Sequence, residues 1–133
     1  MTAPLRHAEP IVVKVALGAR AYDIVIGRGL IATLGERIRA LRPGAKTAIV
    51  TDATVAEHHL AAVEAAVKSA RLESSAIVVP PGEGSKSYAT FETVCEAIIA
   101  AHIERGDLVI ALGGGVIGDL AGFAAASARR GLD

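Results

Sequence analysis

Residues 108–119 read LVIALGGGVIGD, and this stretch predicts the fold of the chain. A run of five apolar residues is typical of a strand buried on both faces of a parallel sheet. Gly113, Gly115 and Gly118 then satisfy G-x-G-x-x-G where a helix is expected to begin. Glycine lets the backbone approach a pyrophosphate, and a helix N-terminus offers free N–H donors to its oxygens. A tight strand-to-helix turn with small residues explains the same pattern, so both interpretations stay open.

Two details separate this motif from the usual dinucleotide fingerprint. It follows the last strand of the chain rather than the first, and an acidic residue, Asp119, comes directly after it instead of about 20 residues later. In the first helical turn, Asp119 would complement the helix dipole. The alternative is that its carboxylate bonds a hydroxyl of a ligand.

The same region raises the question of a membrane span, because Asp119 is the only charge between residues 108 and 128 and the mean hydropathy is +0.46. A carboxylate in mid-membrane costs roughly 3 kcal/mol. Five glycines interrupt the stretch, and residues 1–10 lack the apolar core of a signal peptide. We therefore expect a buried strand, a glycine turn and a buried helix in a soluble protein.

Outward from this motif, strand-like segments alternate with segments of helical apolar spacing. The expected strands are 11–17, 22–26, 47–50, 76–79 and 108–112. The expected helices are 30–41, 54–70, 88–104 and 116–129. We expect the second helix to open with a capping box of Thr54 and Glu57. The alternation predicts an α/β fold: a Rossmann-like, mostly parallel sheet flanked by helices, with an N-terminal β-hairpin at its edge.

The domain organisation follows from the same pattern. We expect a flexible tail over residues 1–10 and one α/β domain over residues 11–133. The alternation calls for another strand after the last helix, so the chain reads as the front piece of a longer protein.

Composition excludes several classes of function. Fourteen basic and 14 acidic residues give a net charge of zero, which offers no basic stripe for nucleic acid. The single cysteine cannot form an internal disulfide, which favours a reducing, cytoplasmic setting. Cys95 lies on the predicted apolar face of helix 88–104 and reads as a small buried hydrophobe.

A second candidate site is the loop PPGEGSKS at residues 80–87, which follows a predicted strand. Open α/β sheets bind ligands at this end of their strands. Glu83 can accept from ribose hydroxyls, and Lys86 can bond a phosphate or an amide carbonyl. A solvated loop with Ser85 or Ser87 as helix cap is the alternative. Asp52 is a third acidic residue at the end of a predicted strand. The alternative interpretation is that Asp52 is only a turn residue ahead of the Thr54 cap.

The remaining candidates carry less chemistry. His58 and His59 are adjacent on a helix and point about 100° apart, so they cannot chelate one metal ion from it. Arg129 and Arg130 end the last helix, where cations suit the dipole, or they capture an anion. We find no metal site and no catalytic acid–base set in the sequence.

Together, residues 80–87 and 112–131 resemble the 3-dehydroquinate synthase family of the sugar-phosphate cyclases. PGEGSK and GGGVIGDLAGF are written nearly as that family writes them. The resemblance covers the chain from about residue 11 and corresponds to the family's N-terminal NAD-binding part. It implies an all-helical second domain beyond residue 133, which would hold the catalytic residues and the divalent metal, zinc or cobalt.

The resemblance also implies an activity and site residues. The full enzyme would convert 3-deoxy-D-arabino-heptulosonate 7-phosphate to 3-dehydroquinate and phosphate, using NAD that is regenerated in each turnover, and would act as a cytoplasmic homodimer. Arg130 would reach the substrate phosphate, and no catalytic residue would lie within this chain. The implied NAD contacts are Asp52, Glu83, Lys86, Gly114, Gly115 and Asp119.

Three other functions stay open. The chain could come from another sugar-phosphate cyclase, of the 2-deoxy-scyllo-inosose or valiolone synthase type. It could come from a metal-dependent polyol dehydrogenase of related architecture, although those usually place Gly-Gly-Gly-Ser where Val116 follows here. The third alternative is a non-catalytic NAD-binding module.

Overall fold

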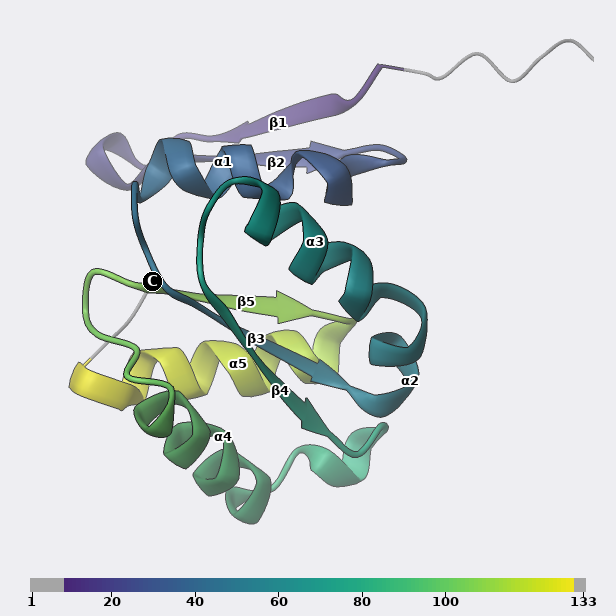
Figure 1. The fold of residues 1–133 in the computed structure, drawn as a ribbon, viewed down its shortest axis with the longest axis vertical. Coiled ribbons are helices and arrows are strands. Elements are labelled where there is room, and N and C mark those ends of the chain that lie inside the picture. The colour runs from purple at the N-terminus through teal and green to yellow at the C-terminus, as the bar shows by residue number, and fades with distance from the viewer. Residues whose placement is uncertain (1–8, 131–133) are drawn as a thin grey trace, which may run out of the picture. The chain divides into compact units, whose positions relative to one another are not determined.

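The structure is a computed structural model and describes residues 9–130, without the side chain of Arg130. The chain divides into two compact units, with the boundary between Leu30 and Ile31. Figure 1 shows the strands and helices of both units. The predicted tail lies largely outside the described residues.

The first unit is the predicted hairpin. Strand β1 (Ile11–Val15) pairs antiparallel with β2 (Tyr22–Ile26), with the short helical turn η1 (Gly18–Arg20) between them. The two strands form a sheet of their own, so the expectation that the hairpin edges the parallel sheet is wrong. Antiparallel strands that follow each other in the chain can be joined by a short connection and pair with each other directly.

The second unit contains a parallel three-stranded sheet in the order β4-β3-β5. Its strands are β3 (Thr47–Asp52), β4 (Ser74–Val79) and β5 (Leu108–Leu112). The central strand pairs in parallel with both neighbours, as the strand–helix alternation predicts. β3 is buried along almost its whole length because helices cover both of its faces.

Helices α1 (Leu34–Leu41) and α3 (Ala61–Ser69) cover one face of this sheet, and α4 (Tyr88–Ala100) and α5 (Gly115–Ser127) cover the other (Figure 1). Successive side chains of β3 point to opposite faces of the sheet, so the second unit has one hydrophobic core on each face. Ala48 and Val50 pack toward α4 and α5, whereas Ile49 packs toward Val63 and Val67 of α3. Burying each large aliphatic side chain contributes about 1.5–3 kcal/mol.

The helix predicted over residues 54–70 is composite. It consists of α2 (Ala53–Val55), the π-helical turn η3 (Ala56–Leu60) and α3. Its cap is not the predicted box of Thr54 and Glu57, because Asp52 Oδ1 accepts from the backbone N–H of Val55 at 2.8 Å. Asp52 is the last residue of β3, two residues before Thr54, and its carboxylate takes the capping position first.

Other predicted elements are present with shifted ends. The first helix begins with the 3₁₀ turn η2 (Leu30–Thr33), α4 ends at Ala100 rather than residue 104, and the short turn η5 (Ala128–Arg130) follows α5. The expectation that β5 is buried on both faces is wrong: most of it is half-buried and Ala111 is exposed. Among the described residues, β5 has β3 as its one ladder partner, which explains this exposure.

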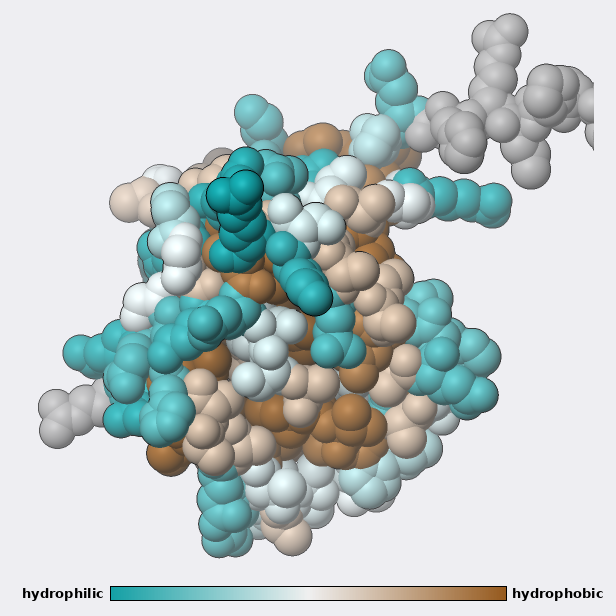
Figure 2. All heavy atoms as spheres, viewed as in Figure 1, coloured by the Kyte–Doolittle hydropathy of each residue, from teal (hydrophilic) through white to brown (hydrophobic). Residues whose placement is uncertain are grey.

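The apolar stretch 108–128 is resolved into a strand, a turn and a helix. No helix in residues 9–130 has the length and apolarity that crossing a membrane requires. Figure 2 shows apolar atoms gathered over β4 on one face of the second unit, where Val78 is 50% exposed. Hydrophobic side chains therefore also reach the surface of this unit.

Candidate functional site

Three loops meet at the carboxyl edge of the parallel sheet. Strand register aligns Thr51 with Leu112 and Asp52 with Val79, so the residues that follow each strand start at the same level. The candidate residues at this level are Asp52, which is the last residue of β3, the loop that begins at Pro80 and the turn that begins at Gly113. The structure therefore brings the three candidate regions of the sequence to one edge of the sheet (Figure 1).

The order of the strands makes this edge a topological switch point. β3 leads into α3 on one face of the sheet, whereas its neighbour β5 leads into α5 on the opposite face. Where adjacent strands send their helices to opposite faces, the two loops diverge and leave room for a ligand. Asp52 and the Gly113–Gly115 turn flank this point.

The glycines of the turn have different structural roles. A Cβ on Gly113 would lie 2.9 Å from Ile117 Cγ1, and Ile117 is 98% buried, so the fold itself requires glycine there. A Cβ on Gly114 or Gly115 would meet nothing within 4 Å. The fold does not require glycine at these two positions. An object that approaches the backbone closely would require it.

The N-terminus of α5 opens onto the same space. Gly114 is its N-cap residue, and no side chain in the described part of the chain caps this helix. The first backbone N–H groups of a helix have no acceptor within it and carry the positive end of its dipole. The open space at Gly114 and Gly115 therefore adjoins donors suited to a pyrophosphate.

An ion pair joins the second loop to α5. Lys86 Nζ lies 2.8 Å from Asp119 Oδ2, and the two side chains are 51% and 62% exposed. The hydrogen bond to Asp119 raises the pKa of Lys86, and the charges of Asp119 and Glu83 add to this effect. Glu83, Lys86 and Asp119 thus form one cluster of two acids and one base.

This pair corrects one interpretation of Asp119. Gly115 is the first helical residue of α5, so Asp119 lies in the second turn and not in the first. The dipole effect falls off within the first turn, and Asp119 faces Lys86 instead.

A hollow of about 360 Å³ lies beside the ion pair, between the start of α4 and α5. Its apolar wall includes Phe91 and Phe123, whose ring centroids are 4.5 Å apart, and Tyr88, which is 86% exposed. None of these aromatic residues belongs to the candidate site predicted from the sequence. The chain has only four Phe and Tyr residues, and three of them flank the two motifs, which is the signal that could have found them.

The structure does not bring Arg130 to this site. α5 is 13 residues, or about 20 Å, long, and Arg130 follows its far end. The side chain of Arg130 lies outside the described part, so its role stays a prediction. Arg129, at φ +51°, places a guanidinium nitrogen 3.6 Å from Glu104 Oε1.

The other candidates have local partners. His58 and His59 are exposed, with ring centroids 6.3 Å apart. Cys95 packs against the α4–α5 core, and burial raises the pKa of its thiol. Within residues 9–130, no group of three or more His, Cys, Asp or Glu side chains is arranged to hold a metal ion.

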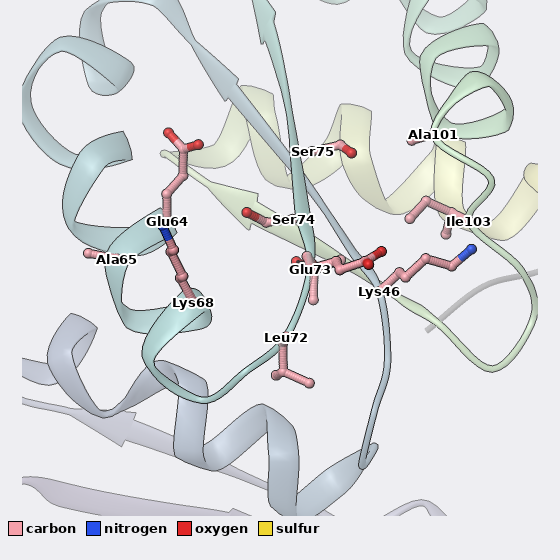
Figure 3. Close-up of a pocket in the computed structure, with 11 residues that line it drawn as sticks. Lys46, Glu64, Ala65, Lys68, Leu72, Glu73, Ser74, Ser75, Ala101 and Ile103 are labelled. Carbon is pink, nitrogen blue, oxygen red and sulfur yellow. Dashed lines mark hydrogen bonds between the residues drawn. The ribbon is translucent and has the colours of Figure 1, made fainter.

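A further hollow, of about 510 Å³, lies at the opposite, amino edge of the sheet. Figure 3 shows Glu64 and Lys68 of α3 on one side of it and Lys46 on the other. Lys46 Nζ donates to the His102 carbonyl at 2.6 Å. This hollow contains none of the sequence motifs, so we place the candidate site at the carboxyl edge.

Comparison with solved structures identifies the class of fold. The second unit's sheet and helices belong to an architecture shared with sugar-phosphate cyclases. A 2-deoxy-scyllo-inosose synthase, solved with carbaglucose-6-phosphate, NAD+ and Co2+, matches with a TM-score of 0.79 and 21% identity, over 92% of this chain and 33% of that one. The 2-epi-5-epi-valiolone synthase of Streptomyces hygroscopicus, with NAD+ and Zn2+ bound, matches with a TM-score of 0.72 and 30% identity, over 89% of this chain and 32% of that one.

Sequence comparison is more specific. Residues 76–133 match the family model described as 3-dehydroquinate synthase N-terminal. The 3-dehydroquinate synthases of Bradyrhizobium diazoefficiens and of Bradyrhizobium sp. are 66% and 68% identical over all 133 residues. The resemblance is therefore confirmed: this chain is a homologue of 3-dehydroquinate synthases. It spans 35% of the length of these relatives.

Proposed function

We propose that this chain is the NAD-binding part of a 3-dehydroquinate synthase. The observation that carries the proposal is the carboxyl edge of the sheet, where an uncapped helix N-terminus, two sterically unneeded glycines and the Glu83–Lys86–Asp119 cluster lie together. Identities above 60% to synthases over the whole chain favour this reaction over that of the cyclases matched at 21% and 30% identity.

The residues present fit a dinucleotide. Gly114, Gly115 and the first N–H groups of α5 would bind the pyrophosphate. Asp119 and Glu83 are acceptors for ribose hydroxyls, and Lys86 supplies a cation at the same place. Asp52, at the end of β3 beside the strand that leads into the glycine turn, would contact the adenosine end.

Bound NAD would supply a hydride acceptor that is regenerated within one turnover. The chain's own residues would bind and orient it. The full-length protein would release phosphate from 3-deoxy-D-arabino-heptulosonate 7-phosphate and form 3-dehydroquinate. We propose that a divalent metal, zinc or cobalt, is held by residues outside this chain, that Arg130 contacts the substrate phosphate, and that the enzyme is a cytoplasmic homodimer.

Two measurements test the proposal. Calorimetric titration of the folded chain with NAD should show binding, and the chain alone should release no phosphate. A full-length protein containing this segment should release phosphate from the heptulosonate phosphate without net NADH. Net NADH from a polyol would instead indicate a dehydrogenase, and turnover of glucose 6-phosphate would indicate an inosose-type cyclase. If neither the folded chain nor the full-length protein binds NAD, the proposed cofactor site is rejected.

A further inference from the structure

The loop between β4 and α4 contains one buried polar side chain, and its role is not explained by direct contact with a ligand. Ser85 is 3% exposed, whereas residues 80–84, 86 and 87 are exposed. Its hydroxyl donates to the carbonyl of Pro80, the first residue of the loop. This bond joins two points of the loop that are five residues apart.

Backbone hydrogen bonds complete a compact turn around Ser85. The N–H of Ser85 donates to the Gly82 carbonyl at 3.1 Å, and the N–H of Lys86 donates to the Glu83 carbonyl at 3.0 Å. Gly82 has φ +93°, a conformation that favours glycine, and this reverses the chain direction after Pro81. The side-chain bond of Ser85 fixes the closed form of this turn against the end of β4.

The next residue along the chain is Lys86. Its backbone position follows directly from the closure of the turn, and its ammonium meets Asp119 of α5. A lysine side chain on a mobile loop would populate many rotamers. Fixing it against one partner would then cost conformational entropy. Closure of the turn confines Lys86 to the neighbourhood of Asp119.

We propose that Ser85 is a positioning residue: its hydroxyl bond to the Pro80 carbonyl holds the loop closed so that Lys86 stands against Asp119. Ser85 acts through Lys86 and does not need to touch the ligand. The proposal deepens the proposed function and rests on it only for the identity of the ligand as NAD. Placement of Lys86 is a property of the free protein and can be measured without NAD.

The first test follows the titration of Lys86 by NMR in the free protein. Because Asp119 and Glu83 raise the pKa of Lys86, Asp119→Asn should lower it. Ser85→Ala should lower it in the same direction, since the open loop carries Lys86 away from Asp119. Val67→Ala, which weakens the core on the other face of the sheet, is the destabilising control and should leave this pKa unchanged. A pKa that falls in Asp119→Asn but stays unchanged in Ser85→Ala would overturn the proposal.

The second test is a double-mutant cycle on NAD affinity. Loss of one hydrogen bond that orders the loop should weaken binding about three- to tenfold in Ser85→Ala. In a Lys86→Ala background, the same substitution should change the dissociation constant by less than about twofold. Equal effects in both backgrounds would show that Ser85 does not act through Lys86.

These tests separate the two proposals. If the unmodified protein does not bind NAD, the proposed function fails while the Lys86 titration still decides the role of Ser85. If Ser85→Ala does not fold, Ser85→Cys keeps a weak donor in a slightly larger side chain. That variant should shift the Lys86 pKa by an intermediate amount, and an unchanged value would count against the proposal.

Discussion

The ammonium nitrogen of Lys86 lies 2.8 Å from a carboxylate oxygen of Asp119, although the two residues are 33 positions apart and belong to different motifs. The pair connects the loop after β4 to the helix after β5. Both side chains are more than half exposed, so solvent screens their attraction and the pair contributes little to folding. Asp119 belongs to the helix that follows the glycine turn, so a role in ligand binding explains the pair better than a role in stability.

The first prediction separates binding from stability at this pair. Asp119→Asn and Lys86→Ala should leave the thermal midpoint nearly unchanged, because the pair is exposed. Each should weaken NAD binding about tenfold or more, the magnitude expected for a hydrogen bond to a charged group. Calorimetry and thermal melts of the same samples provide both values. Asp23→Asn in β2 of the hairpin, which removes the same charge from a strand outside the sequence motifs, is the control and should bind NAD normally.

The second prediction concerns pH. The pKa of Lys86 is raised, with the hydrogen bond to Asp119 as the largest cause, so the ammonium stays charged throughout the neutral range. A group whose pKa is higher in the folded state stabilises that state below its unfolded pKa, and this contribution is lost as pH rises through the folded pKa. The Lys86–Asp119 pair should therefore persist at pH 6–9 and open only above the ordinary lysine value of about 10.4. A Lys86 side-chain NMR signal that moves between pH 6 and 9 would contradict this.

Much of the fold could be predicted because it depends on local patterns. Apolar runs identify β3, β4 and β5, and glycine and proline mark where they end. The cap of the helix after β3 could not be predicted, because Asp52 and Thr54 are both good caps and the end of β3 decides between them. The exposure of β5 depends on which strands pair, which is a property of the whole sheet.

The candidate site divides in the same way. The loop residues could be selected from the sequence because glycines and charged side chains follow three predicted strands, and the carboxyl ends of parallel strands meet at one edge of a sheet. The pairing of Lys86 with Asp119 and the burial of Ser85 depend on how two loops meet in space, and no sequence spacing encodes them. The aromatic wall of Phe91 and Phe123 likewise appears only when α4 packs on α5.

The third prediction tests the double role of Asp52. Its carboxylate caps the helix through the Val55 N–H, so Asp52→Ala should reduce the free energy of unfolding by about 1 kcal/mol and also weaken NAD binding. Asp52→Asn keeps a side-chain oxygen acceptor and should retain the stability. Chemical denaturation measures the first effect and calorimetry the second. Loss of stability in Asp52→Asn equal to that in Asp52→Ala would show that the charge, not the cap, is required.

The fourth prediction concerns the packing of α1 on α3. A Cβ on Gly35 would lie 2.1 Å from the Ala66 carbonyl oxygen and 2.8 Å from Ala70 Cβ. Gly35→Ala should therefore force the helices apart and lower the free energy of unfolding by about 1–3 kcal/mol. Gly106→Ala, where a Cβ meets nothing within 4 Å, is the matched control. Denaturant titration compares the two, and equal stability would contradict the close approach of α1 to α3.

The last prediction divides the glycine turn into a folding residue and two binding residues. Gly113→Ala should destabilise the protein, because its Cβ would collide with the buried Ile117. Gly115→Ala should fold as well as the unmodified chain or slightly better, since alanine favours the helix that begins there and its Cβ meets no neighbour. Gly114→Ala should also fold, because its φ of −91° suits any residue.

The two variants that fold normally should be the ones that lose NAD affinity. In Gly114→Ala and Gly115→Ala the added methyl groups would occupy the space in which a pyrophosphate meets the first N–H groups of α5, so NAD affinity should fall at least tenfold in proteins of normal stability. Denaturation curves and calorimetric titrations on the same three variants measure both properties. Gly118→Ala, also free of Cβ contacts but one turn further into the helix, should lose less affinity than Gly115→Ala. Normal NAD binding by Gly114→Ala and Gly115→Ala would show that the turn is structural, because only an approaching ligand gives those two positions a reason to be glycine.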